Sequence, residues 1–390
     1  MKRTAISILL IAVIHLIGFA QQINVPVFIS GAEGYKTFRI PAIIGLKDGT
    51  LLAFCEGRVN GAADFGDIKI VLKRSTDHGK TWSPLQTIVD NDRLQAGNPA
   101  PVIDLTDPAY PRGRIFLFYN TGNNSESQVR KGKGLREVWY KTSTDAGVTW
   151  SPAVNITGQV HHPMQTETNP AYNDRLDWRS YANTPGHAIQ LQNEKYRGRI
   201  YIIANHSAGD AQNKFTDYDV HGYYSDDHGS TFHLSHNLDI PGSNESMAVE
   251  LSDGRLMINT RNQTGNPGLR IVAISSNGGE KWDKVYYDSL LHDPVCQGSI
   301  LNIHLKKNRS ALAFCNDDET KKRNNLTLRI SNTDGADWPV KFIVDKSADD
   351  YKGDFTAYSD LVQISKNKIG VLYERDSYKQ IVFKLINIKK

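Results

Sequence analysis

Arg39 stands near the head of an otherwise apolar run, TFRIPAII, which spans residues 37–44. A guanidinium group that is buried without a partner destabilises a protein by several kcal/mol or more. Arg39 therefore lies either at the exposed end of a strand or in a place where it binds an anion. One arginine alone supports both interpretations, so the rest of the chain has to decide between them.

A repeated eight-residue motif indicates the elements that must position such a residue. Its form is Ser-x-Asp-x-Gly-x-Thr-Trp, and closer or looser copies occur at residues 75–82, 143–150, 225–232, 275–282 and 331–338. Asp and Ser side chains bond to their own backbone in turns, Gly adopts positive φ without strain, and the closing aromatic residue packs beneath the turn. The motif therefore predicts a hairpin turn and carries no chemistry of its own.

The motifs are embedded in a repeated series of strands. An apolar run is followed by a turn, a second run and a third run, which in five units leads into the motif. Six such units predict an all-β fold, a six-bladed β-propeller with four-stranded antiparallel blades. A series of β-sandwiches is the alternative, but the single register of all six units counts against it. The sixth unit lacks an outer strand, which residues 23–30 can supply to close the ring.

Several ionisable residues fall at one face of the predicted disc. In each blade the start of the first strand, the end of the second and the start of the third share this top face, whereas the repeated motif lies on the opposite face. The residues in these positions are Arg39, Arg58, Asp64, Glu245, Arg261, Arg323, Tyr358 and Glu374. Because the blades converge at the axis, their side chains can meet in one shallow cup. A sugar-binding propeller would present the same face as an enzyme, so position alone leaves both functions open.

The Phe-Arg-Ile-Pro motif at residues 38–41, together with the repeats, closely resembles the exo-α-sialidases of the bacterial and animal type. In that family the repeat is called the Asp box or BNR repeat. The Asp box also occurs in other propellers, whereas Arg-Ile-Pro followed by Arg, Glu and Tyr in order is highly specific. The resemblance covers the whole chain after residue 20. It implies a hydrolase that removes terminal sialic acid from glycoproteins, glycolipids or oligosaccharides and needs no cofactor and no metal ion.

The resemblance implies a role in substrate binding for five of the candidate residues. Arg39, Arg261 and Arg323 look like the triad that binds the carboxylate of sialic acid. Arg58 looks like a further substrate-binding residue, and Glu374 looks like the carboxylate that steadies Arg39. Arginine pairs bidentately with a carboxylate and stays charged at any working pH. Arg39 is then expected to act as an anion clamp, and its place at the start of a strand puts it there.

Three further residues look like the catalytic group of the family. Asp64 resembles the acid/base of a mobile loop, Tyr358 the nucleophile, and Glu245 the base that takes the proton of the tyrosine. Most retaining glycosidases attack with a carboxylate, and tyrosine is the known exception in sialidases. A neutral tyrosine avoids the repulsion that a carboxylate would meet at a centre already bearing negative charge. The implied reaction is hydrolysis with retention of configuration.

Two rival functions stay open at this stage. A transferase that passes the sialyl group to another sugar, or closes it on itself, would differ only in the shape of its acceptor site. A catalytically silent sialic-acid-binding propeller would keep the arginines but need not keep Asp64, Glu245 and Tyr358. The insertion at residues 161–187 is expected on the top face, where Trp178 and Tyr181 either stack on a sugar ring or pack against their blade.

The ends and the composition of the chain bear on where it acts and with what. Residues 1–20 have a basic start, an apolar run and a small-residue end, which is typical of a cleaved signal peptide, so residues 21–390 are expected to form a single propeller domain in a secreted or periplasmic protein. Basic and acidic residues are nearly balanced, and the formal net charge of +4 is too small to indicate a nucleic-acid partner. No other stretch is long and apolar enough to span a membrane, and we expect a monomer whose partners are sialylated glycans.

Overall fold

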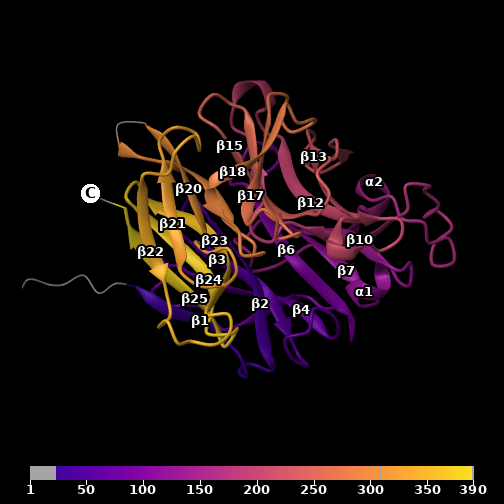
Figure 1. Cartoon of the computed structure of the whole chain (residues 1–390), viewed down its shortest axis with the longest axis horizontal. Helices are drawn as coiled ribbons and strands as arrows, with labels where there is room; N and C mark the ends of the chain where they lie inside the picture. The colour runs from indigo at the N-terminus through magenta and orange to yellow at the C-terminus, as the bar shows by residue number, and fades with distance from the viewer. Residues whose placement is uncertain (1–22, 307–308, 389–390) are drawn as a thin grey trace, which may run out of the picture.

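A computed structural model describes residues 23–306 and 309–388, so the expected signal peptide lies outside the described residues and export stays a prediction. The described residues contain no helix that is long and apolar enough to cross a membrane. The chain forms six antiparallel blades around a central axis (Figure 1), which confirms the prediction of an all-β, six-bladed propeller. Each blade runs from an inner strand at the axis to an outer strand at the rim.

The first three blades use the first half of the chain. Blade 1 consists of β2 (Thr37–Gly45), β3 (Leu51–Arg58), β4 (Ile68–Ser75) and β5 (Gln86–Val89). Blade 2 consists of β6 (Gln95–Asp104), β7 (Arg114–Gly122), β8 (Arg136–Ser143) and β9 (Val154–Asn155). Blade 3 consists of β10 (Trp178–Asn183), β11 (Ile189–Gln190), β12 (Ile200–Ala208), β13 (Tyr218–Ser225) and β14 (His233–Leu234). A single parallel bridge between Ile68 and Gln95 joins the sheets of blades 1 and 2.

The last three blades complete the ring. Blade 4 consists of β15 (Ser243–Glu250), β16 (Leu256–Asn262), β17 (Leu269–Ser275) and β18 (Lys284–His292). Blade 5 consists of β19 (Ser299–His304), β20 (Ser310–Asp317), β21 (Leu326–Ser331) and β22 (Val340–Asp345). Blade 6 consists of β23 (Thr356–Ser365), β24 (Lys368–Arg375), β25 (Gln380–Asn387) and β1 (Asn24–Ile29). The short helices α1 (Glu126–Val129) and α2 (Thr157–Val160) and two 3₁₀ turns (Glu194–Tyr196 and Asn213–Phe215) lie in connecting loops.

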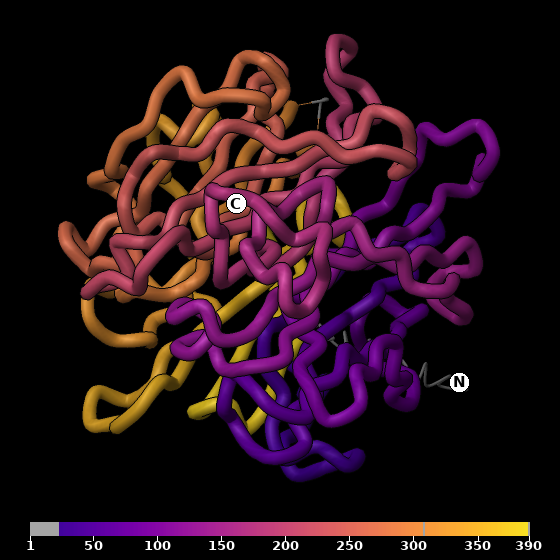
Figure 2. Tube along the Cα trace, turned by 90° about the vertical axis from the view of Figure 1, so that its right-hand side faces the viewer, coloured from indigo at the N-terminus to yellow at the C-terminus, as the bar shows by residue number. Residues whose placement is uncertain are grey.

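Blade 6 closes the ring with strands from both ends of the chain. β1 pairs antiparallel with β25, from Asn24 opposite Lys384 to Ile29 opposite Gln380. The indigo and yellow segments consequently lie side by side in both Figure 1 and Figure 2. Pro26 lacks a backbone N–H, and it is tolerated here because β1 is an edge strand. The prediction that residues 23–30 supply the outer strand is confirmed.

The core lies between the blades. Six clusters of buried apolar side chains fill the six spaces between consecutive blades. The aromatic residue of the repeated motif adds to this packing, since Trp82 of blade 1 lies 5.6 Å from Phe383 of blade 6 and Trp150 of blade 2 lies 6.0 Å from Phe54 of blade 1. The motif thus links each of these blades to the blade before it, on the face opposite the candidate site.

The first copy of the motif shows how the turn is held. The Asp77 carboxylate accepts hydrogen bonds from the backbone N–H of Lys80 and Thr81 and from the Thr81 hydroxyl, at 2.7–3.0 Å. The Ser75 hydroxyl accepts one from the N–H of Gly79, whose φ is +87°. This arrangement confirms a hairpin turn, because all side-chain bonds stay within the turn and none points to a substrate.

The inner strand of blade 3 differs from the prediction. The run TPGHAIQL at residues 184–191 predicts this inner strand, but the structure interrupts it: β10 comes from the predicted insertion, and β11 resumes after a gap of five residues. Pro185 has no N–H to donate to a ladder, and Gly186 has a φ of +103°. The chain therefore leaves the sheet between the two pieces.

Candidate functional site

The top face holds a cavity of about 290 Å³ at the axis. Seven of the eight predicted site residues line it, namely Arg39, Arg58, Asp64, Glu245, Arg261, Arg323 and Tyr358. The eighth, Glu374, is fully buried directly behind Arg39. They come from blades 1, 4, 5 and 6, as the position of each residue at the start or end of its strand predicts.

Arg39 is fixed by the neighbouring blade. Its Nε and Nη2 donate to the two carboxylate oxygens of Glu374 at 2.9 and 3.2 Å. The next residue, Ile40, has a φ of +58°, which is rare for a β-branched side chain, and its N–H donates to the same carboxylate at 2.8 Å. The strand bulges at this point, with a register shift between Arg39 and Ala42. Although burial lowers the pKa of Arg39, the adjacent Glu374 raises it well above its usual value, so the guanidinium is a permanent cation.

Arg323 is held by residues that the sequence did not indicate. Its Nη2 donates to the carbonyl oxygen of Val295 at 2.9 Å, and its Nη1 donates to the Tyr378 hydroxyl at 3.3 Å. Tyr378 in turn donates to Asp354 at 2.5 Å, and its ring lies under the Arg39 guanidinium. These residues lie in loops whose conformation the sequence pattern does not specify. Asp354 and Tyr378 are close in sequence to β23 and β24, whereas Val295 lies between β18 and β19.

Tyr358, Glu245 and Arg261 form a closed triangle at the floor of the cavity. The Tyr358 hydroxyl donates to Glu245 Oε1 at 2.6 Å. Arg261 Nη1 donates to Glu245 Oε2 at 2.6 Å and to the Tyr358 oxygen at 2.8 Å. Burial raises the pKa of Tyr358 well above its usual range and Glu245 raises it further, against the lowering effect of the three arginines. The phenol is therefore neutral in the free protein, with a carboxylate placed to take its proton.

Asp64 lies at the rim, in the loop between β3 and β4. Its side chain is 74% exposed, and it accepts a hydrogen bond from Arg58 Nη1 at 2.7 Å and lies 3.7 Å from Arg39 Nη1. The protein groups around the carboxyl displace part of its water and act to raise the pKa of Asp64, but Arg58 and Arg39 outweigh this effect and the pKa is lowered overall. Arg58 also donates to the buried Glu56, which lines the cavity and which the sequence reasoning missed.

The insertion places its two aromatic residues differently. Trp178 is buried and stacks on the ring of His206, with centroids 3.5 Å apart and planes 12° apart. Of the two alternatives for Trp178, packing against its blade is therefore correct. Tyr181 is 2% exposed and its hydroxyl lies 3.2 Å from His221 Nε2, yet it also lines the cavity.

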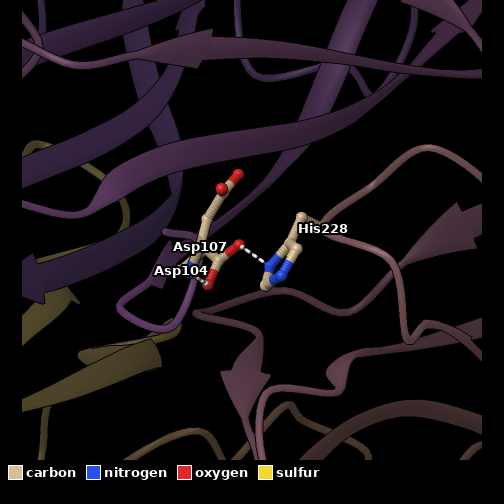
Figure 3. A group of neighbouring side chains, drawn as sticks. All are labelled: Asp104, Asp107 and His228. Atoms are coloured by element: carbon tan, nitrogen blue, oxygen red, sulfur yellow. Dashed lines mark hydrogen bonds and ion pairs between the residues drawn. The ribbon is translucent and has the colours of Figure 1, made fainter. Parts of the chain in front are cut away.

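One group of possible metal ligands lies on the opposite face. The donor atoms of Asp104, Asp107 and His228 fall within 4.8 Å of one another (Figure 3). Asp104 already accepts from His228 Nδ1 at 2.8 Å and from Gln190 at 2.6 Å, and Asp107 accepts from Arg114 at 2.9 Å. Because these partners occupy the carboxylate oxygens and one of them is a cation, we interpret the group as an ion-pair link between blades 2 and 3.

Fold and site together define a class of protein: a six-bladed propeller whose axial cavity combines an arginine cluster with a tyrosine–carboxylate pair and a carboxylate at the rim. The chain matches the model of the BNR repeat-like domain over residues 49–371. It is 31% identical to a sialidase of Micromonospora viridifaciens over 365 residues, which cover 89% of this chain and 51% of that protein. The chain thus spans about half the length of that relative.

Solved structures show the same fold. The Hadza microbial sialidase Hz136 matches with a TM-score of 0.76 and 23% identity, over 92% of this chain and 67% of that one. The intramolecular trans-sialidase from Ruminococcus gnavus matches with a TM-score of 0.70 and 18% identity, over 93% and 96%. The chain belongs to the family of the BNR repeat-like domain, and the relatives that it matches over most of its length are named sialidases.

Proposed function

We propose that this protein is an exo-α-sialidase that hydrolyses terminal sialic acid from glycoconjugates with retention of configuration. The observation that carries the proposal is the 2.6 Å hydrogen bond from Tyr358 to Glu245 inside a cavity lined by several arginines. A sugar-binding protein would need the arginines but not a nucleophile that is bonded to a base.

The arginine cluster suits a sugar that carries a carboxylate on its anomeric carbon. Arg39, Arg261 and Arg323 come from blades 1, 4 and 5 and converge on one cavity. Glu374 and Tyr378 hold two of them in place before any ligand arrives, which reduces the entropy lost on binding. The bound carboxylate then sets the anomeric carbon above Tyr358.

The reaction proceeds in two displacements. In the first, the Tyr358 oxygen attacks the anomeric carbon while its proton passes to Glu245, the glycosidic bond breaks, and the leaving oxygen takes a proton from Asp64. In the second, Asp64 takes a proton from water, the water oxygen attacks the same carbon, and Tyr358 leaves and regains its proton from Glu245. Two inversions give overall retention.

Asp64 has to be protonated for the first displacement, but its pKa is lowered in the free protein. The cause of the lowering also suggests how substrate reverses it. When the substrate carboxylate occupies Arg39, it neutralises part of the positive charge near Asp64, and the sugar excludes water from an otherwise exposed side chain. Both effects favour the protonated form when it is needed.

The test is release of a fluorescent aglycone from an α-sialoside by the protein and by a Tyr358→Phe variant. We expect turnover by the parent and a loss of at least about 10³-fold in the variant, because the nucleophile is removed while the ring and the arginines stay. Mass analysis of the sugar product separates hydrolysis, which gives free sialic acid, from intramolecular transfer, which gives an anhydro sugar. A folded parent that binds sialic acid without turnover would contradict the proposal in favour of a binding protein.

A further inference from the structure

Arg136 differs from the other buried arginines of the described residues in having no carboxylate partner. The six others each form an ion pair at 2.5–3.2 Å; they are Arg39, Arg58, Arg199, Arg261, Arg270 and Arg329. Arg136 is 5% exposed and makes a side-chain hydrogen bond to Gln95 Oε1. A guanidinium carries five N–H donors, so most of the donors of Arg136 are available to a ligand.

A glycine on the neighbouring strand determines where the Arg136 side chain goes. Gln95, Gly122 and Arg136 lie opposite one another on β6, β7 and β8, in a row across the top of blade 2. Because Gly122 has no side chain, Arg136 extends over it toward the inner strand and reaches Gln95. A Cβ atom on residue 122 would lie 1.6 Å from Arg136 Nη1, so any other residue there would displace the guanidinium.

The row faces the same cavity as the catalytic residues. Arg136 and Gln95 line it from blade 2, and Tyr181 lines it from blade 3. Blades 2 and 3 lie across the ring from blades 5 and 6, which carry Arg323 and the nucleophile. A sugar whose carboxylate is bound at the arginine cluster must therefore direct its other end, with its acylamino group and hydroxyl chain, toward this wall.

We propose that Arg136, placed over Gly122 and oriented by Gln95, is a specificity-determining residue that binds carbonyl or hydroxyl oxygens on the end of the sugar remote from its carboxylate. The proposal rests on the proposed function. Glu126 lines the same wall, so a second anion would be repelled there. A neutral group that has acceptor oxygens for Arg136 and an O–H or N–H donor for Glu126 fits this wall better. Discrimination is expected because a substrate without the group leaves a buried donor unpaired.

The experiment compares three sialosides with one leaving group: the N-acetyl sugar, an analogue with hydroxyl in place of the acylamino group, and an analogue with a shortened hydroxyl chain. The variants are Gly122→Ala, which displaces Arg136 without removing it, Arg136→Lys and Arg136→Met. Gly158→Ala is the control, because a Cβ there meets nothing within 4 Å. Melting temperatures establish that each variant is folded.

We expect Gly122→Ala and Arg136→Met to lower kcat/KM for the N-acetyl sugar by about 10- to 100-fold and to leave one of the trimmed analogues close to the parent value. The analogue that is spared identifies which group Arg136 binds. An equal loss on all three substrates, or no loss, would overturn the proposal. If the parent turns over none of them, the proposed function fails, and calorimetric binding of the three free sugars by the same variants tests the role of Arg136 independently.

Discussion

The Tyr378 ring lies beneath the guanidinium of Arg39, 4.2 Å from its central carbon, and the Tyr378 hydroxyl accepts a hydrogen bond from Arg323. Two arginines from different blades are thus held in position by one side chain. The turn that presents it contains three successive residues of positive φ, Asp376, Ser377 and Tyr378, at 50–65°. Such residues cost about 1–3 kcal/mol each when they are not glycine, so the surrounding structure has to hold them in place.

Replacing Tyr378 with Phe should weaken substrate binding more than catalysis. The variant keeps the ring under Arg39 but loses the bond to Arg323, so we expect KM to rise about 5- to 20-fold with a smaller change in kcat. The affinity of a carboxylate inhibitor should fall, while that of its methyl ester should change little. Tyr351→Phe is the matched control, because its hydroxyl bonds to Asp376 in the same turn without touching an arginine. Equal losses for acid and ester would show that Tyr378 has only a structural role.

Asp64→Asn should make the rate depend strongly on the leaving group. Without a general acid, departure of a sugar alcohol should slow by about 10²- to 10⁴-fold, whereas an acidic phenol needs little protonation and should leave nearly as fast as from the parent. The measurement is kcat/KM for aryl sialosides of graded leaving-group pKa and for a sialyl disaccharide. The control is Asp67→Asn in the same loop, outside the axial cavity. A uniform loss across the series would contradict the assignment.

Three buried histidines predict that the fold weakens in mild acid. Burial lowers the pKa of His161 and His206 well below the usual value of 6.5, and that of His221 to about 3. Below pH 6.5 the unfolded chain therefore binds protons that the folded protein rejects. Stability is fully present above pH 6.5 and falls as the pH drops toward 3, with each histidine adding a slope of about 1.4 kcal/mol per pH unit.

The check is the free energy of unfolding in urea at several pH values between 7.5 and 5. His221→Gln should reduce the slope of the unfolding free energy against pH by the contribution of one histidine. Substitution of the exposed His304 with Gln should leave this slope unchanged. A stability that is independent of pH over this range would show that these histidines are not buried in solution.

Asp77→Ala should destabilise the protein without affecting its chemistry. The carboxylate holds the turn of the first repeated motif, and its hydrogen bonds lower its pKa to about 2. We expect a loss of about 1 kcal/mol in the free energy of unfolding, as for other side chains that cap backbone N–H groups. Parent-like kcat/KM is expected, since the turn lies on the opposite face. Lys80→Ala is the control, and a loss of activity at an unchanged melting temperature would contradict the structural role of the motif.

The positions of the candidate site residues can be predicted because a propeller relates strand position to place in space. Arg39 at the start of an inner strand and Arg261 at the end of a second strand had to share the top face once the strands were identified. The same rule applies to Arg136, which begins a third strand just as Arg323 precedes one. The sequence alone does not single out Arg136, because its role depends on Gly122, a relation across strands that is visible only in the register.

Other features depended on local conformation that a sequence pattern does not specify. Tyr378 reaches the arginines through a turn of three left-handed residues, none of which is glycine, so the turn carried no signal. The sequence predicts the inner strand of blade 3 too late in the chain, because residues 184–191 read as one strand. Pro185 and Gly186 interrupt that run, and the pairing begins instead at Trp178.

The pairing of β1 with β25 has a consequence for the order of events during synthesis. β1 is made before every other strand of the described chain, yet its partner is the last of these strands. Until then β1 is an unpaired edge, which is the kind of segment that invites association with other chains, and Pro26 makes it a poor template for such pairing. Blade 6, which carries Tyr358, is completed only after the five other blades have been made. Tyr358 thus gains its final setting last, so the candidate site is not assembled before β25 has been made.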